Sequence, residues 1–311
     1  MNFAEDRNSA KSGCAASRAD GRKTVFITGG SWRNLAVSDC VPSRSFVIPV
    51  LDYSLNSEFN ILSLLLDLKD IPGHVIVIFN DPKIAEELRN HSRIDHYVIM
   101  KRNVGVSRAW NVGIDVAESP TVFFLNADLH VEIETIELLE RALWKLDRAA
   151  CAGPQGGFVD FRLAADHFYF EKGSFRQPIE VDVVSGFLFC VKRELFDDAI
   201  LRFETALTPC YFEELDLGLQ IRRAGRKSYI VPATGYDHRW GGTIGALETI
   251  PFLGREEAAA SIEARNRELF YRKWRAIASL PDSSPNLLDS CWGGLRRKDS
   301  GNLHEHGRRS D

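Results

Sequence analysis

Short runs of β-branched and aromatic residues alternate with amphipathic, helix-like segments along most of this chain. One run, residues 75–79 (VIVIF), contains no polar side chain, and another, Thr121–Leu125 (TVFFL), is apolar after its first residue. Apolar strands of this kind are typical of parallel sheets, because helices cover both faces of such a sheet. The alternation therefore predicts an α/β fold with a mostly parallel central sheet flanked by helices.

The same patterns predict where the elements lie. Strands are expected at residues 46–50, 75–79, 97–100, 121–125, 187–191 and 228–231. Helices are expected at residues 56–68, 106–118, 132–148 and 256–274, with another beginning near 213, and a Gly-rich loop at 153–157. No internal repeat or internal linker interrupts them, which predicts a single domain over residues 23–280 between a flexible leader (1–22) and a flexible polar tail (281–311).

Composition excludes several classes of protein. The chain has 311 residues, 44% of them hydrophobic and 26% charged, which is typical of a soluble globular protein. A net charge of −4 gives no reason to expect a nucleic-acid partner. The six cysteines form no C-x-x-C pair, which favours reduced thiols in the cytoplasm over a zinc site or a disulfide framework. No apolar stretch reaches the length of a membrane span.

An acidic helix start lies within residues 209–232 (PCYFEELDLGLQIRRAGRKSYIVP), where Gly225 can end the helix. Glu213, Glu214 and Asp216 fall in its first turn. The backbone dipole and free N–H groups of a helix N-terminus favour ionised carboxylates, and an ionised, partly enclosed carboxylate can serve as a general base for a hydroxyl nucleophile. Acidic first turns are also ordinary at helix starts, so this segment alone leaves both interpretations open.

Polar residues follow the predicted strands, at the sheet edge where open α/β proteins bind ligands. They are Asp52, Asn80, Asp81, Asn103, Asn126 and Asp128. Asp128 could help hold a hard divalent cation on a diphosphate. His130 could be a further ligand, although a surface or capping histidine is the commoner role.

Three further segments could contribute to a site. Residues 102–115 (RNVGVSRAWNVGID) place Asn103, Gly105, Arg108 and Asn111 around a helix start, where they could bind a sugar or a phosphate or simply begin and pack a helix. Residues 237–243 (DHRWGGT) supply His238, a possible metal or diphosphate contact next to a glycine pair. Ser185 and Gly186 precede a strand, where glycine could leave room for an acceptor.

In order, these segments resemble glycosyltransferase family 2, particularly its rhamnosyltransferase-like bacterial members. The order is N-x-G with a later N-x-G, a strand ending N-x-D, S-G before V-K-R-E, F-E-E-x-D-L with R-x-A-G-x-K, and a histidine before Gly-Gly. The resemblance covers roughly residues 45–275, and RKW at 272–274 resembles the family's C-terminal ending.

This resemblance implies a GT-A fold and transfer of a sugar from a nucleoside diphosphate, usually with inversion and with Mg²⁺ or Mn²⁺. Asp128 matches the last Asp of the D-x-D motif, and His238 matches a histidine that joins the metal or the diphosphate in some members. Glu214 matches the catalytic base, and Glu213 and Asp216 would support it or the acceptor.

The resemblance also implies where the two substrates bind. The implied donor side consists of Pro49, Asp52, Asn80, Asp81, Asn103, Gly105, Arg108, Asn111 and Asn126, and the implied acceptor side of Ser185 and Gly186. The expected partners are a UDP-, dTDP- or GDP-linked sugar and a glycan or lipid-linked acceptor, as in polysaccharide biosynthesis.

The chain departs from the family at the end of the strand expected at 75–79, within the sequence VIVIFNDP of residues 75–82. Phe79 stands where the family has an Asp that holds the nucleobase, so Asn80 or Asp81 would have to replace it. Leu51 and Asp52 replace an aromatic residue and an Asn of the family's first strand, and Asn126 replaces the first Asp of D-x-D, as in the rhamnosyltransferase-like members.

Two alternatives stay open at this point. The departure at Phe79 favours a catalytically silent GT-A domain that binds a nucleotide sugar or a protein, whereas Asp128, Glu214 and His238 favour an enzyme. Thr28–Gly30 (TGG) could indicate a dinucleotide-dependent oxidoreductase, but no G-x-G-x-x-G follows a strand there. The basic, aromatic segment 265–275 could touch the inner face of a membrane, although packing on the domain is the commoner role.

Overall fold

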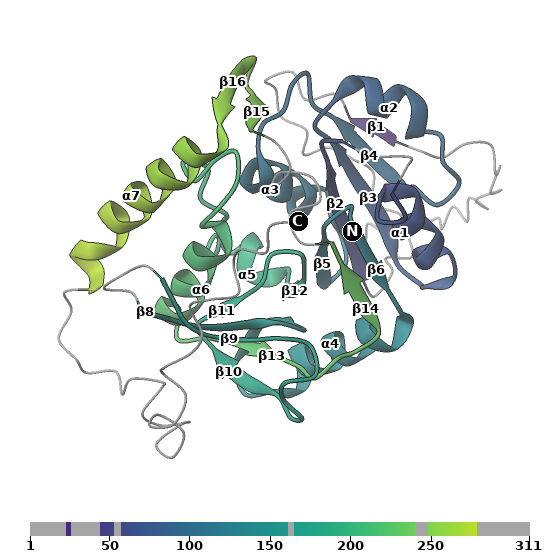
Figure 1. Cartoon of the computed structure of the whole chain (residues 1–311). Coiled ribbons are helices and arrows are strands. Elements are labelled where there is room, and N and C mark those ends of the chain that lie inside the picture. The colour runs from purple at the N-terminus through teal and green to yellow at the C-terminus, as the bar shows by residue number, and fades with distance from the viewer. Residues whose placement is uncertain (1–22, 26–43, 53–56, 161–164, 240–247, 279–311) are drawn as a thin grey trace, which may run out of the picture.

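A nine-stranded mixed sheet forms the centre of the described part of the chain (Figure 1). The computed structural model describes residues 23–25, 44–52, 57–160, 165–239 and 248–278. In spatial order the strands are β1 (Lys23–Val25), β4 (His96–Ile99), β3 (His74–Phe79), β2 (Arg44–Val50), β5 (Thr121–Leu125), β12 (Leu188–Lys192), β7 (Ala149–Gly153), β13 (Lys227–Ile230) and β10 (Ile179–Val181). The expected GT-A-like α/β architecture is confirmed.

The strand order reverses beside β2. The chain runs outward from β2 through β3 to β4, and then returns to the other side of β2 with β5, all in parallel. Beyond β5 the sheet becomes mixed, because β12 is antiparallel to both β5 and β7. The carboxyl ends of β2 and β5 therefore border the crevice at which open α/β sheets bind ligands.

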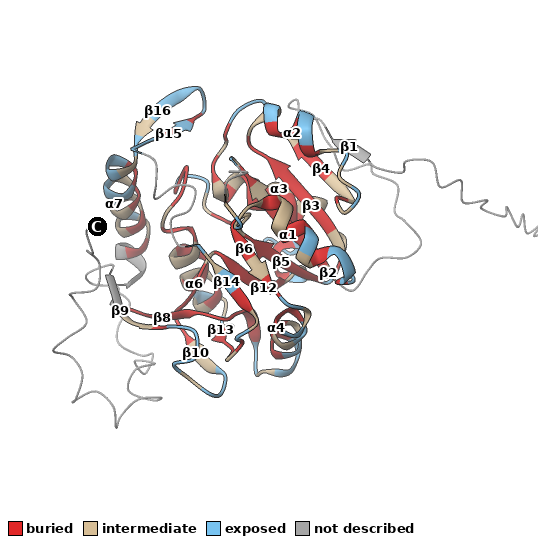
Figure 2. Cartoon of the chain, turned by 45° about the vertical axis from the view of Figure 1, so that its right-hand side comes forward, coloured by how far each residue is buried: buried red, intermediate tan, exposed pale blue. Residues whose placement is uncertain are grey.

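Helices cover both faces of this sheet. Side chains of α1 (Ile61–Asp67), α2 (Pro82–Leu88) and α4 (Ile133–Lys145) join one buried apolar cluster, and those of α3 (Val106–Val116), α5 (Glu194–Asp197) and α6 (Glu213–Arg223) join another. Alternate residues of β3 belong to the two clusters, as expected for a strand buried on both sides. Figure 2 shows the inner strands of the central sheet buried and the outer helix faces exposed.

Three smaller sheets lie around the central one within the described residues. A three-stranded sheet has the order β11 (Val183–Val184), β8 (Gly156–Asp160) and β9 (Ala165–Phe170). β6 (Leu129–Val131) pairs antiparallel with β14 (Tyr236–His238), which brings His238 opposite Leu129. A hairpin of β15 (Thr249–Phe252) and β16 (Arg255–Ala258) precedes the long helix α7 (Ala259–Ala278).

Several predicted boundaries were wrong. The expected glycine loop at 153–157 is largely β-structure, because Gly153 ends β7 and Gly156 begins β8. The final helix begins at Ala259 rather than Glu256, which belongs to the hairpin. α1 begins after Asn60, whose side chain accepts hydrogen bonds from the amides of Leu62 and Ser63 and so caps the helix.

Other predictions fall outside the described residues, namely the leader, the tail, the Thr28–Gly30 segment and the glycine pair Gly241–Gly242. None of the described helices is long and apolar enough to cross a membrane.

The close packing of α3 on β2 yields a first prediction. A Cβ atom added at Gly113 would lie 2.1 Å from Val47 Cγ1, on a fully buried β-branched side chain that cannot move aside. Gly113→Ala gains about 1 kcal/mol in helix propensity, but overpacking costs roughly 1–3 kcal/mol. We therefore expect a net loss in the free energy of unfolding by chemical denaturation. Val47→Ala should reduce that loss in the double variant, and additive effects would contradict the steric explanation.

Candidate active site

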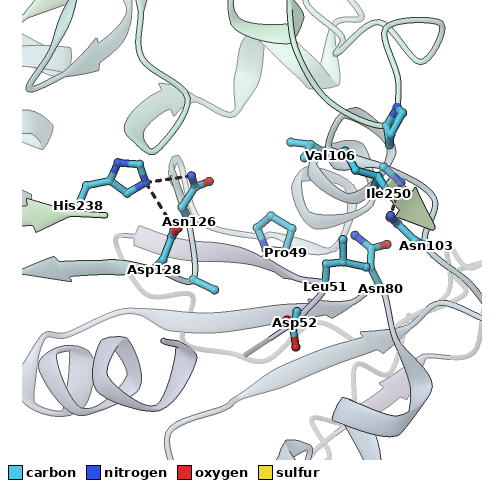
Figure 3. A pocket seen from close by; sticks show the side chains of 13 residues that line it. Pro49, Leu51, Asp52, Asn80, Asn103, Val106, Asn126, Asp128, His238 and Ile250 are labelled. Atoms are coloured by element: carbon cyan, nitrogen blue, oxygen red, sulfur yellow. Dashed lines mark hydrogen bonds and ion pairs between the residues drawn. The ribbon is translucent and has the colours of Figure 1, made fainter. Parts of the chain in front are cut away.

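A pocket of about 130 Å³ opens at the carboxyl ends of β2 and β5 (Figure 3). Residues from both halves of the chain line it. They are Pro49, Leu51, Asp52, Asn80, Asn103, Gly105, Val106, Asn126, Ala127, Asp128, Pro209, His238 and Ile250. Most of the polar lining residues were predicted from the sequence, and the reversal of strand order beside β2 explains why they meet here.

Asp128 and His238 form one end of the pocket. His238 Nε2 lies 3.3 Å from Asp128 Oδ1 and 3.3 Å from Asn126 Nδ2. The His238 ring stacks on Phe187, with ring centroids 4.5 Å apart and an interplanar angle of 12°. The pairing of β14 with β6 therefore brings together two residues that are far apart in the sequence, and Phe187 fixes the orientation of the imidazole.

This end fits a divalent cation. Adjacent ligands of an octahedral ion with bonds of about 2.1 Å lie roughly 3 Å apart, close to the observed separation of Asp128 Oδ1 and His238 Nε2. No group of three or more His, Cys, Asp or Glu side chains that could hold a metal occurs among the described residues. The protein would thus supply two ligands and leave the remaining positions to substrate oxygens and water.

Leu51, Asn80, Asn103 and Ile250 lie on the other side of Pro49 (Figure 3). Asn80 is buried, and its Oδ1 accepts a hydrogen bond from the Val104 amide at 3.3 Å. Asn103 Nδ2 donates to the Pro251 carbonyl at 2.7 Å and so ties the β15–β16 hairpin to the pocket. This end is therefore lined by amides and apolar side chains, with Asp52 exposed beside them.

The two candidates that could replace the family's nucleobase-binding Asp are separated by the structure. Phe79 is fully buried in the cluster under α1 and α2. Asn80 lines the pocket, whereas Asp81 caps α2 by accepting a hydrogen bond from the Lys83 amide at 2.8 Å. Of the two, Asn80 has the position from which a ligand can be contacted.

Arg108 and Asn111 were also predicted on the donor side, but they do not line this pocket. Arg108 Nη1 donates to Thr208 Oγ1 at 3.1 Å, and Asn111 exchanges hydrogen bonds with the Phe203 backbone at 2.8 and 3.1 Å. Both side chains attach α3 to the segment that precedes α6. His130 also has a structural contact, since its Nδ1 lies 2.8 Å from Asp67 Oδ2.

Gly105 lets this segment approach the pocket. Its φ is +84°, and a Cβ atom there would lie 2.4 Å from Thr208 Oγ1 and 2.8 Å from Pro209 Cα. The Val106 amide donates to the Pro209 carbonyl at 2.7 Å. The N-terminus of α3 thereby brings Pro209 to the pocket wall, just before the acidic helix.

The three acids at the start of α6 have different surroundings. Glu214 is partly exposed, and its Cδ lies 3.9 Å from the Cβ position of Gly186, which packs against Trp110. Gly186 precedes Phe187, the residue stacked on His238, and the Phe187 carbonyl accepts the Asn126 amide at 2.9 Å. Residues 186–187 thus connect Glu214 to the Asp128–His238 end of the pocket.

Glu213 is buried, and its Oε2 has no hydrogen-bond partner among the described residues. Burial, and then the charge of Glu214, raise the pKa of Glu213 well above its ordinary value. Glu213 therefore favours its neutral form, unlike a carboxylate that acts as a base.

Asp216 is fully buried and faces α7. It accepts hydrogen bonds from Trp274 Nε1 at 2.7 Å and Gln220 Nε2 at 2.6 Å, and Lys273 Nζ lies 2.9 Å away. Burial raises the pKa of Asp216, and the bond and charge of Lys273 oppose that shift. These contacts give Asp216 a structural place between two helices rather than one at the pocket.

Ser185, predicted on the acceptor side, is fixed next to Gly186. The Tyr169 hydroxyl lies 2.5 Å from Ser185 Oγ and donates to Gln155 Oε1 at 3.0 Å. Sequence reasoning missed Tyr169 and Gln155, and it missed the pocket residues Val106, Ala127, Pro209 and Ile250. The four pocket residues contribute apolar or backbone surface, for which the sequence carries no distinctive signal.

Residues 45–199 match the family model described as Glycosyl transferase family 2. This region belongs to glycosyltransferase family 2. The matched region contains the pocket residues from Pro49 to Asp128 together with Ser185 and Gly186, whereas α6, His238 and α7 lie beyond it. No curated protein matches the chain by sequence search.

Among similar solved structures, that of GalNAc-T7 shares the fold. The crystal structure of GalNAc-T7 with UDP, GalNAc and Mn²⁺ is 15% identical with a TM-score of 0.57, covering 76% of this chain and 49% of that one. The structure of S. aureus TarS 1–349 with UDP is 20% identical with a TM-score of 0.44, covering 62% of this chain and 59% of that one. The chain thus spans about half the length of the first and less than two thirds of the second.

The raised pKa of Glu213 predicts how stability depends on pH. The folded chain holds this proton more tightly than the unfolded chain, so the free energy of unfolding falls as pH rises from the ordinary value of 4.5 through the raised pKa. Glu213→Gln removes this loss. We expect the variant to gain stability relative to the parent at about pH 8, and the gain to shrink towards about pH 4, in thermal unfolding measured at each pH.

Glu194→Gln is the matched control, since Glu194 lies in the first turn of α5 but is exposed. It should show no such trend. A difference between Glu213→Gln and the parent that stays constant over this pH range would contradict the buried, neutral state of Glu213.

Proposed function

We propose that this protein is an inverting, metal-dependent glycosyltransferase that moves a sugar from a nucleoside diphosphate to a hydroxyl group of a glycan or lipid-linked acceptor. The observation that carries the proposal is the connection through Gly186 and Phe187 between Glu214 and the Asp128–His238 pair. It provides a carboxylate for the acceptor hydroxyl near a site suited to the leaving diphosphate.

In this proposal each group has a defined task. Glu214 accepts the proton of the acceptor hydroxyl as that oxygen attacks the anomeric carbon. The sugar–phosphate bond breaks on the opposite side, and the nucleoside diphosphate leaves with the bond's electron pair. Asp128 and His238 would hold Mg²⁺ or Mn²⁺, which supplies stabilisation of the charge that grows on the diphosphate. Attack opposite to the leaving group inverts the anomeric centre.

The donor site would extend across Pro49. The diphosphate would lie near Asp128 and His238, and the nucleoside near Leu51, Asn80 and Asn103 (Figure 3). UDP-, dTDP- and GDP-linked sugars are the donor classes to test. The crystallised GalNAc-T7 contains UDP and Mn²⁺, and TarS contains UDP, which makes UDP with Mn²⁺ the first pair to try.

A second candidate is a catalytically silent GT-A domain that binds a nucleotide sugar or a protein partner. The burial of Phe79 in the core favours it, because no carboxylate takes the family's nucleobase-binding position. The two candidates differ in turnover rather than in nucleotide binding.

Glu214→Gln should separate them. The amide keeps the size of the side chain but cannot accept the proton, so turnover should fall about 10²- to 10⁴-fold while nucleotide affinity is kept. The release of nucleoside diphosphate measures turnover, and calorimetry measures binding. Glu194→Gln, another first-turn acid, should keep full activity. Full activity of Glu214→Gln would rule out Glu214 as the base, and absence of turnover in the parent would favour the silent domain.

Asp128→Asn tests the metal-dependent donor site. Thermal unfolding would be measured with UDP, dTDP and GDP, each with and without Mn²⁺. A nucleotide at a hundred times its dissociation constant adds about 2.7 kcal/mol of stability, and the variant should lose the metal-dependent part of that gain. Asp81→Asn should keep it, because Asp81 also follows a strand but does not line the pocket. Equal shifts in all three proteins would argue against Asp128.

A further inference from the structure

A buried polar residue interrupts the apolar face of α7. Ile262, Asn266, Phe270 and Trp274 are spaced four residues apart, and each is at most 6% exposed. Residues at this spacing share one helix face. Asn266 is 0% exposed between two apolar neighbours, and a buried amide in such a place must have hydrogen-bond partners to offset its lost hydration.

The partners of Asn266 lie in the segment that leads into α6. Its Nδ2 donates to the Cys210 carbonyl at 2.8 Å and to the Tyr211 carbonyl at 3.3 Å. Tyr211 and the residue after it, Phe212, have left-handed backbones, with φ of +80° and +74°. This conformation is unfavourable for aromatic side chains and persists only where the surroundings enforce it.

α7 also contacts the chain on both sides of this turn. Arg265 donates to the Thr208 carbonyl before it. Trp274 and Lys273 bind Asp216 after it, at 2.7 and 2.9 Å. The Phe270 ring packs on Phe212, with centroids 5.6 Å apart. Glu213 and Glu214 therefore lie in a stretch of chain that α7 holds at each end.

We propose that α7 positions Glu214, and that Asn266 is the positioning residue that holds the 210–212 turn in the conformation from which Glu214 faces Gly186. This proposal rests on the proposed function, in which Glu214 is the base. The amide group is the decisive feature, because an aliphatic residue would fill the same stripe but could not bind the two carbonyl groups. Asn266 acts through Glu214 and need not touch a substrate.

Asn266→Asp is the variant that tests the proposal. It keeps the size of the side chain but turns oxygen rather than N–H towards the Cys210 and Tyr211 carbonyl groups. Arg272→Ala is the matched control, because Arg272 is on the same helix with a side chain 70% exposed and pairs with Glu268. Trp274→Phe is a milder second variant that keeps an aromatic ring but loses the hydrogen bond to Asp216 and part of the buried volume of the indole.

Three experiments would be done on each protein. Hydrogen–deuterium exchange would follow residues 207–217, with Thr121–Leu125 as the internal reference. Calorimetry would give the affinity for UDP with Mn²⁺, and release of nucleoside diphosphate from UDP-glucose, dTDP-rhamnose and GDP-mannose would give kcat and KM.

We expect Asn266→Asp to speed exchange at 207–217 about tenfold and to lower kcat about 10- to 100-fold, because small misplacements of reacting groups cost that much. UDP affinity, donor KM and exchange at Thr121–Leu125 should change less than about twofold. Trp274→Phe should shift exchange and kcat in the same direction by less, and Arg272→Ala should match the parent. Unchanged exchange or unchanged kcat in Asn266→Asp would overturn the proposal.

The double variant Asn266→Asp/Glu214→Gln tests whether the effect passes through Glu214. It should be no slower than Glu214→Gln alone, because a misplaced base that is already disabled loses nothing more. Multiplied losses would overturn the positioning role. If Glu214→Gln alone were fully active, or the parent released no nucleoside diphosphate, the proposed function would fail instead. Exchange at 207–217 would then still decide whether Asn266 holds the turn.

Discussion

The parallel pairing of β2 with β5 is the constraint on which the candidate site depends. Phe46 pairs with Phe123 and Val47 with Phe124, so the two strands end at the same edge of the sheet. Pro49 and the residues after it thereby meet the turn that carries Asn126 and Asp128. Because the chain reaches β5 only after running outward to β4 and back, the strand order reverses between these two strands, and the pocket opens beyond their ends.

The second half of the chain is built onto this edge by specific contacts. Phe187 stacks on His238 and its carbonyl accepts the Asn126 amide, so a single residue after Gly186 joins the end of β5 to β14. Gly105 allows the 208–209 backbone to approach α3 to a distance that a side chain would prevent. A Cβ atom at Gly105 would lie 2.8 Å from Pro209 Cα, which explains why glycine is needed at this position.

The acids of α6 illustrate how position decides the state of a carboxyl group. All of them lie in the first turn, where the helix dipole favours negative charge. Burial opposes ionisation most where no partner compensates it, as for Glu213, and less where Lys273 and Trp274 bind the group, as for Asp216. Glu214 is the one of the three that is partly exposed, which is why it is the acid proposed as the base.

Sequence patterns predicted those strands, helices and turns that depend mainly on residues close together in the sequence. The apolar strands and the polar residues that follow them could be recognised from residue period and burial alone. Six of the nine strands of the central sheet and most of the polar pocket residues were therefore predicted, whereas β1, β7 and β10 were not. Asp81 was placed at the site as well, because turn and cap residues have the same composition as ligand-binding ones. Asn111 was placed there too, although it lies within α3 and bonds the Phe203 backbone. The β6–β14 and β15–β16 pairs and the partners of Asp216 depend on contacts between distant segments, which no local pattern encodes.

Asn266 shows why such long-range contacts matter for function. An apolar residue in its place would bury more favourable surface, since a buried amide at best recovers the hydrogen bonds that it lost from water. Its presence is better explained by specificity than by stability, because it selects one conformation of the 210–212 turn. The family match ends at residue 199, so Glu214 and the helix that holds it both lie beyond the matched region. The catalytic role proposed for Glu214 therefore rests on the contacts that α7 makes with the 208–216 segment.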